Sequence, residues 1–124
     1  MTIIDRETAT REKIRKMAFG TVYPLYLQKI TKKGRSQEEL DTLVSWLTGY
    51  SPDRIRQCME SGMDFETFFA NAPRIHPDAP KVKGSICGVR VEEIQDPLVR
   101  RVRILDKLVD ELAKGKALEK VLRP

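Results

Sequence analysis

The fold is decided by residues 96–115, DPLVRRVRILDKLVDELAKG, which carry the longest helical pattern in the chain. Their apolar residues recur at alternating spacings of four and three, and this spacing predicts one buried helix face. Asp96 is a suitable N-cap, Pro97 suits the first helical position, and Gly115 can take the left-handed conformation that ends a helix. The sequence therefore predicts a helix over 97–114, and we expect the other elements to pack around this central helix.

Length and composition indicate a globular protein. A chain of 124 residues suits one domain over 1–124, and its 33% charged and 40% apolar residues are unlike the composition of disordered chains. No apolar run approaches the roughly 18 residues of a membrane span, and the charged N-terminus is unlike a signal peptide. We therefore expect a cytoplasmic protein with no membrane partner, in which residues 1–10 are flexible.

Two helices are predicted before residue 34. The first can be capped by Thr8 or Thr10. Pro24 interrupts the helical pattern, because a residue that precedes proline is biased away from the helical conformation. We therefore expect a break around residues 19–23 and a second helix from Pro24 to Lys33.

Three further helices are predicted from N-cap residues at Ser36, Ser51 and Asp64. Ser36 and Glu39 have the spacing of a capping box, and Pro52 follows Ser51 at a first helical position. Together with the long helix, these elements predict an all-α fold, a compact bundle of five to six short helices.

Residues 73–95 interrupt this helical pattern. Four prolines or glycines fall within twelve residues here, namely Pro73, Pro77, Pro80 and Gly84. The second half of the segment has the β-branched alternation of a short extended segment or hairpin. We therefore expect one long irregular loop that packs down through its apolar residues, and a loop of this length is a favourable place for function.

Five strings of the sequence carry a family resemblance. They are WLTGY at 46–50, DFETFF at 64–69, APRIHPDAP at 72–80, KGSICGVRVEEIQDPL at 83–98 and LDKLVDELAKGKALEKVLR at 105–123. These strings resemble the bacterial family catalogued as domain of unknown function 2200, over a range from about Ile14 to Arg123. The resemblance implies a small, mainly helical, bacterial cytosolic protein. The family brings no assigned activity, cofactor or catalytic residue, so no function is carried over from it.

Residues 41–60 have the spacing of a helix-turn-helix. The second helix would present Arg54, Arg56 and Gln57, and arginine and glutamine can make bidentate contacts with guanine and adenine edges. Against this interpretation, residues 35–70 carry a net charge of −4, which repels phosphate. A nucleic-acid-binding module is therefore an alternative hypothesis.

The long helix also carries a basic face formed by Arg100, Arg101 and Arg103. This face can hold phosphate or RNA, and it is a second candidate nucleic-acid surface. It lacks interleaved aromatic residues, and acidic residues follow within two turns, so a solvated face with ion pairs explains it as well. We expect only weak, non-specific binding of nucleic acid.

Cys87 and His76 are the weak catalytic candidates. Cys87 lies near basic residues, which can lower the pKa of a thiol, but a nucleophile also needs a base. The only imidazole is that of His76, eleven residues earlier in the proline-rich loop. A small thiol-dependent enzyme or ligand binder centred on Cys87 is therefore a further alternative. The simpler interpretation makes Cys87 a small buried residue in a turn and His76 a surface loop residue.

The leading interpretation is a small soluble binding or interaction protein without catalytic activity. One histidine cannot supply the usual metal-ligand sets, and we expect neither a metal nor a cofactor. The partner would be another protein or a small ligand. Monomer and homodimer both remain open.

Overall fold

The structure, a computed structural model, describes the backbone of residues 3–123 and the side chains of residues 6–123. Over this range the α-helices are α1 (Ile3–Ile14), α2 (Phe19–Thr31), α3 (Gln37–Thr48), α4 (Pro52–Glu60), α5 (Phe65–Ala70), α6 (Pro97–Ala113) and α7 (Leu118–Val121). The predicted all-α class is confirmed. The described chain has seven helices rather than five or six, because one more turn, α7, forms after Gly115. No described helix is both long enough and apolar enough to span a membrane.

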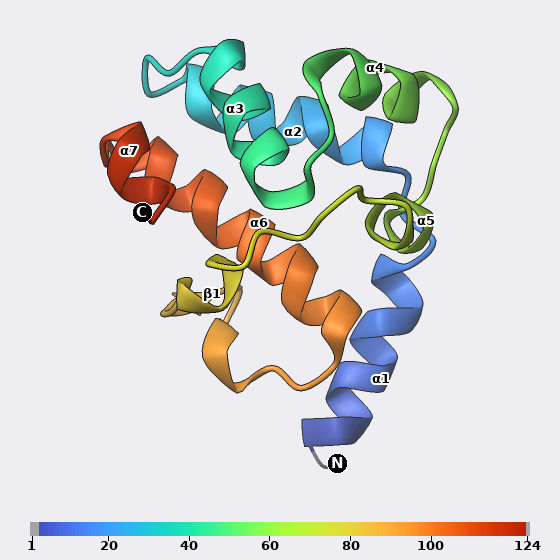
Figure 1. The fold of residues 1–124 in the computed structure, drawn as a ribbon. Helices are drawn as coiled ribbons and strands as arrows, with labels where there is room; N and C mark the ends of the chain where they lie inside the picture. Colours follow the sequence, from blue (N-terminus) through green and yellow to red (C-terminus); the bar gives the residue numbers. More distant parts are fainter. Residues whose placement is uncertain (1–2, 124) are drawn as a thin grey trace.

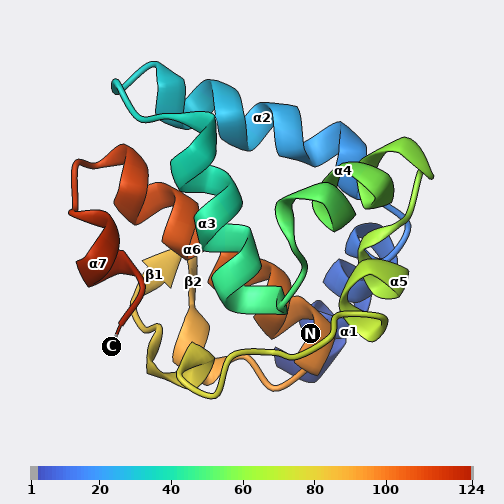
Figure 2. The same cartoon turned by 45° about the horizontal axis from the view of Figure 1, so that its top comes forward.

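The long helix α6 lies among the other elements (Figure 1). Helices α1, α2, α3, α5 and α7 all pack against it, with α1 toward its first turns and α7 beside its last turns. Figure 2 shows α2 and α3 on one side of α6 and the two short strands on another. The apolar stripe predicted for this helix is buried and consists of Leu98, Val102, Leu105, Val109 and Leu112.

The helix caps predicted at Ser36, Ser51, Asp64 and Asp96 are present. The Asp96 carboxylate accepts hydrogen bonds from the N–H groups of Leu98 and Val99, at 3.0 and 3.1 Å. The capping box of Ser36 and Glu39 is complete in both directions. Because each cap satisfies N–H groups that have no helical partner, these residues fix where the helices begin.

The first two helices begin earlier than predicted. α1 starts at Ile3 rather than near Thr8 or Thr10, and α2 starts at Phe19, so the exposed Pro24 lies inside it. The chain leaves the helical conformation at residues 15–18 instead, because Ala18 forms an isolated antiparallel bridge with Asp64. Residues 1–2 lie outside the described residues, and the flexibility expected for residues 1–10 stays a prediction.

The irregular loop over 73–95 contains the extended segment that was expected. Two short 3-10 turns, Ala79–Lys81 and Val91–Glu93, flank an antiparallel hairpin of β1 (Ser85–Ile86) and β2 (Val89–Arg90). Cys87 and Gly88 form the two-residue turn, and their φ angles of 52° and 78° match a hairpin turn that needs positive φ at both positions.

The hairpin packs down onto α6. Val82, Val91 and Ile94 of the loop are buried. The Lys107 ammonium group of α6 donates a hydrogen bond to the Ser85 carbonyl oxygen at 3.2 Å. The loop is therefore held in place by apolar contacts on both sides of the hairpin and by a polar contact at the hairpin itself.

Candidate ligand-binding site

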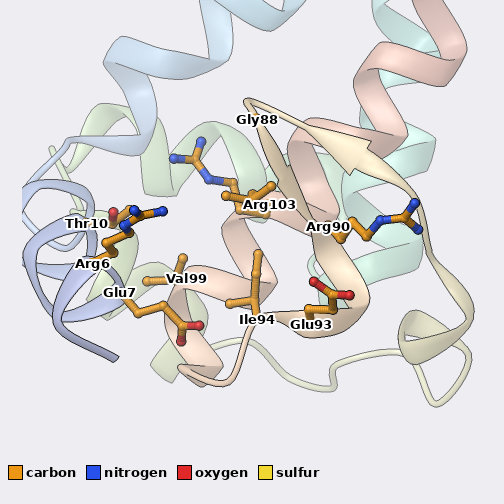
Figure 3. Close-up of a pocket in the computed structure, with 10 residues that line it drawn as sticks. Arg6, Glu7, Thr10, Gly88, Arg90, Glu93, Ile94, Val99 and Arg103 are labelled. Carbon is orange, nitrogen blue, oxygen red and sulfur yellow. The ribbon is translucent and has the colours of Figure 1, made fainter. Parts of the chain in front are cut away.

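A pocket of about 370 Å³ lies between α1, the hairpin and α6 (Figure 3). It is lined by Arg6, Glu7, Thr10, Gly88, Val89, Arg90, Glu93, Ile94, Val99 and Arg103. Its volume is within the range of small-molecule sites in proteins. We call it the hairpin pocket.

The inner part of the hairpin pocket is apolar. Ile94 and Val99 are buried, and Figure 3 shows them between the α1 residues on one side and Arg90 with Glu93 on the other. Val89 adds an apolar side chain that is 41% exposed. A ligand could therefore remove apolar surface from water here, which is the main source of affinity in small-molecule sites.

Glu7 positions the α1 wall of the pocket. Its carboxylate accepts hydrogen bonds from the N–H groups of Gln95 and Asp96, at 3.0 and 2.6 Å. Arg11, one turn further along α1, donates to the Asp96 carboxylate at 3.1 Å. These contacts tie α1 to the start of α6, so Glu7 has a structural role in forming the wall.

Arg103 is held within the pocket wall by a part-buried network. Its guanidinium donates to Asp106 at 3.0 Å, and the Tyr26 hydroxyl donates to the other oxygen of the same carboxylate at 2.5 Å. Burial raises the pKa of Tyr26 well above its ordinary value, and the negative charge of Asp106 raises it further. Arg103, one of the predicted nucleic-acid residues, therefore already has an anionic partner.

Two charged side chains of the hairpin pocket have no such partner. Arg6 on α1 and Glu93 on the loop make no ion pair or side-chain hydrogen bond within residues 6–123. They lie on different sides of the apolar centre in Figure 3. A charged or polar group of a ligand can meet either of them without breaking an existing contact.

Cys87 and His76 occupy different surroundings. Cys87 is exposed at the hairpin tip, so the expectation of a buried cysteine was wrong: the tight turn holds its side chain outside the core. His76 is half-buried rather than a free surface residue, because its ring stacks on Trp46 at a centroid distance of 4.2 Å. Its Nδ1 accepts a hydrogen bond from the Asp78 N–H. No contact between Cys87 and His76 is found within the described residues.

The three α4 residues that are predicted to contact nucleic acid differ in whether they are free to do so. Arg54 and Gln57 are exposed, whereas Arg56 donates to Asp41 at 2.5 Å. The Arg56 guanidinium also lies 5.4 Å from the centre of the Tyr23 ring, and the Tyr23 hydroxyl donates to the same Asp41. Arg56 thus balances the charge of a buried carboxylate. The helix-turn-helix function stays a prediction that rests on the two exposed side chains.

Arg100 and Arg101 line a second pocket, of about 320 Å³, together with His76. These two arginines are predicted from the sequence to share one basic face with Arg103. The α1 residues of the hairpin pocket are not among the predicted site residues, because their segment is expected to be flexible. No sequence pattern in residues 6–10 indicates that they contact the hairpin.

The described chain is thus a predominantly helical protein with a small two-stranded sheet and two pockets beside its irregular loop. Residues 13–123 match the family described as "Uncharacterized protein conserved in bacteria (DUF2200)", and the chain belongs to this family. The fold is similar to the crystal structure of uncharacterized protein SP1917, with a TM-score of 0.84 and 42% sequence identity. That similarity covers 90% of this chain and 91% of the other. No curated protein matches the chain.

Proposed function

We propose that this protein is a small cytoplasmic binding protein without catalytic activity, and that its ligand occupies the hairpin pocket. The observation that carries the proposal is the combination, in one pocket, of an apolar centre at Ile94 and Val99 with unpaired charged groups at Arg6 and Glu93. Concave sites with an apolar lining and a few polar groups are the usual form of small-molecule sites.

The polar lining limits what the ligand can be. Arg103 is paired with Asp106, Arg90 with Glu92, and Glu7 with backbone N–H groups. Among the charged residues of this lining, only Arg6 and Glu93 offer charge without giving up a contact to another described residue. The expected ligand is therefore a small, largely apolar molecule with one or two polar groups, rather than a highly charged one.

The positions of the thiol and the imidazole support binding rather than thiol chemistry. Cys87 and His76 do not line the hairpin pocket. The Nδ1 atom of His76 already accepts a hydrogen bond, and its ring faces Trp46. A general base must reach the proton that it removes, and this arrangement provides no such approach to Cys87.

The test uses two neutral probes, indole and cyclohexanol, with amide chemical shifts as the readout. Both probes should shift the amide signals of Val89, Ile94 and Val99 in a saturable way. Thr10→Trp should abolish these shifts by filling the pocket from α1. Thr21→Trp places the same side chain at an exposed site on α2 and should leave them unchanged.

Two results would overturn the proposal. One is a set of shifts scattered over the surface without saturation. The other is saturable binding that Thr10→Trp and Thr21→Trp leave equally intact, which would place the probes elsewhere in the molecule.

A further inference from the structure

The half-buried arginines of this chain differ in whether they have an anionic partner. Six of them form ion pairs with carboxylates within the described residues: Arg11, Arg15, Arg35, Arg56, Arg103 and Arg123. Arg100 and Arg101 are also half-buried, but neither has a carboxylate or any other side-chain partner in residues 6–123. Because a partly desolvated cation without a counter-charge is unfavourable, these two guanidinium groups favour an anion from solution.

Both unpaired arginines line the second pocket, which lies between the proline-rich loop and the first half of α6. The full lining is Ile75, His76, Pro77, Ala79, Pro80, Gln95, Pro97, Arg100, Arg101 and Ile104. This lining contains no carboxylate, in contrast to the hairpin pocket. Two nearby carboxylates have other partners, since Asp78 pairs with Lys81 at 3.2 Å and Asp96 pairs with Arg11 at 3.1 Å. The charge presented to a ligand in this pocket is therefore positive.

His76 adds a third polar group to the same pocket. Its Nδ1 accepts the hydrogen bond from the Asp78 N–H at 2.9 Å, so in the neutral ring the proton is on Nε2. The stack on Trp46 fixes the plane of the ring. His76 thus supplies one N–H donor, on a ring of fixed plane, to the pocket that Arg100 and Arg101 also line.

We propose that this second pocket binds a phosphate monoester that carries an apolar group. Arg100 and Arg101 bind the phosphate dianion, because guanidinium groups match phosphate oxygens in charge and in the geometry of their donors. The Nε2–H of His76 donates to the same phosphate. The apolar group packs against Ile75 and the loop prolines. This site is separate from the hairpin pocket, and its occupancy does not depend on the function proposed there.

Trp46 gives a direct test, because it is the only tryptophan in the chain and it stacks on His76. Phenyl phosphate should change the tryptophan fluorescence in a saturable way. Inorganic phosphate, which lacks the apolar group, should bind more weakly. Benzyl alcohol, which lacks the charge, should produce no saturable change.

Three variants that each replace one arginine by glutamine show where phenyl phosphate binds. Arg100→Gln and Arg101→Gln should each weaken phenyl phosphate binding by about tenfold or more, the loss expected for one charged hydrogen-bonding group. Neither arginine forms an ion pair with a residue whose side chain the structure describes, so both variants should keep the wild-type circular dichroism spectrum. Arg54→Gln removes the same charge from an exposed site on α4 and should bind as the wild type does.

Three outcomes would overturn the proposal. The first is no saturable response to phenyl phosphate, or an equal response to benzyl alcohol. The second is an equally large loss of phenyl phosphate binding in Arg54→Gln, which would show that binding depends on the net charge of the protein and not on the two pocket arginines. The third is direct binding of random-sequence duplex DNA at physiological salt that competes with phenyl phosphate in the wild type and is itself weakened by Arg100→Gln and Arg101→Gln, which would assign the arginines to a nucleic-acid surface.

Discussion

At the scale of single residues, Leu105 tests whether the apolar face of α6 is packed as described. Its side chain is 0% exposed. Leu105→Ala should lower the free energy of unfolding by about 2–5 kcal/mol, because a buried leucine loses both its transfer free energy and its packing contacts. Denaturant unfolding measures this change. Leu25→Ala, at a leucine that is 59% exposed on α2, is the control and should change the midpoint little. An unchanged midpoint for Leu105→Ala would contradict the packing of α6.

The two cysteines should differ in their reactivity in the native protein. Cys87 is exposed in the hairpin turn, whereas Cys58 is 3% exposed, and burial raises the pKa of its thiol. Since the thiolate is the reactive form, Cys87 should be alkylated first. Timed alkylation of folded protein, read by mass spectrometry at each cysteine, measures the two rates, and the denatured protein serves as the control. Faster labelling of Cys58 would show that α4 is not packed as the structure has it.

At the scale of helices, Gly20 reports how closely α2 and α4 approach. A Cβ atom at this position would lie 2.8 Å from the Met59 carbonyl oxygen. Alanine gains about 1 kcal/mol of helix propensity over glycine, but overpacking costs about 1–3 kcal/mol, so Gly20→Ala should destabilise the protein on balance. Thermal unfolding compares it with Thr21→Ala at the adjacent exposed site. A higher midpoint for Gly20→Ala would mean that the two helices separate at little cost.

The helix starts show which features of the fold could be predicted from the sequence. The caps at Ser36, Ser51, Asp64 and Asp96 act within their own first turn, so a local pattern is enough to identify them. The break before α2 could not be predicted in this way. Pro24 gave a local reason for a break, but the bridge between Ala18 and Asp64 depends on residues far apart in the sequence.

The candidate sites were less predictable than the helices. Arg100 and Arg103 lie about one turn apart on the same face of α6, yet they line different pockets. Of these two, only Arg103 has a carboxylate partner among the described residues, and that distinction depends on how α6 is packed. Helical spacing shows which residues share a face. It does not show which loop covers that face or which carboxylate of another element approaches it.

At the scale of the whole molecule, the two pockets differ in their relation to the family. The hairpin pocket takes one wall from Arg6, Glu7 and Thr10, which precede the matched range of 13–123. The second pocket is formed by residues 75–104 and lies entirely within that range. A ligand of the hairpin pocket would therefore depend on a segment outside the part of the chain that defines the family, whereas a ligand of the second pocket would not.

Three buried tyrosines should make the stability of the molecule fall at alkaline pH. Burial is the main cause that raises the pKa values of Tyr23, Tyr26 and Tyr50 above 10.0, to about 12 for Tyr50. The pKa values of these tyrosines are higher in the folded protein than in the unfolded chain. The contribution of the three protonated tyrosines to stability is therefore complete below pH 10.0, and it is lost as the pH rises through their pKa values in the folded protein.

Denaturant unfolding at a series of pH values from below 10.0 to about 12 measures this loss of stability, and tyrosinate absorbance of the native protein measures the ionisation of the tyrosines. Tyr50→Phe should have a smaller loss of stability above pH 10.0 than the wild type, because the variant has one titrating group fewer. A stability that stays constant over the interval, or native tyrosines that all ionise near 10.0, would contradict the burial of these side chains.

The bridge between Ala18 and Asp64 has a consequence for hydrogen exchange. The Phe19 N–H donates to the Met63 carbonyl oxygen and the Phe65 N–H to that of Met17, both at 2.9 Å. The side chains of both phenylalanines are buried, so water reaches these two amides only when the connection before α2 separates from the connection before α5. Their protons should therefore exchange with deuterium as slowly as those of the α6 core, through global unfolding, while the amides of the exposed hairpin tip exchange through local opening. Exchange followed by amide NMR signals measures this difference, and fast exchange at Phe19 and Phe65 would show that the two connections open independently of the rest of the molecule.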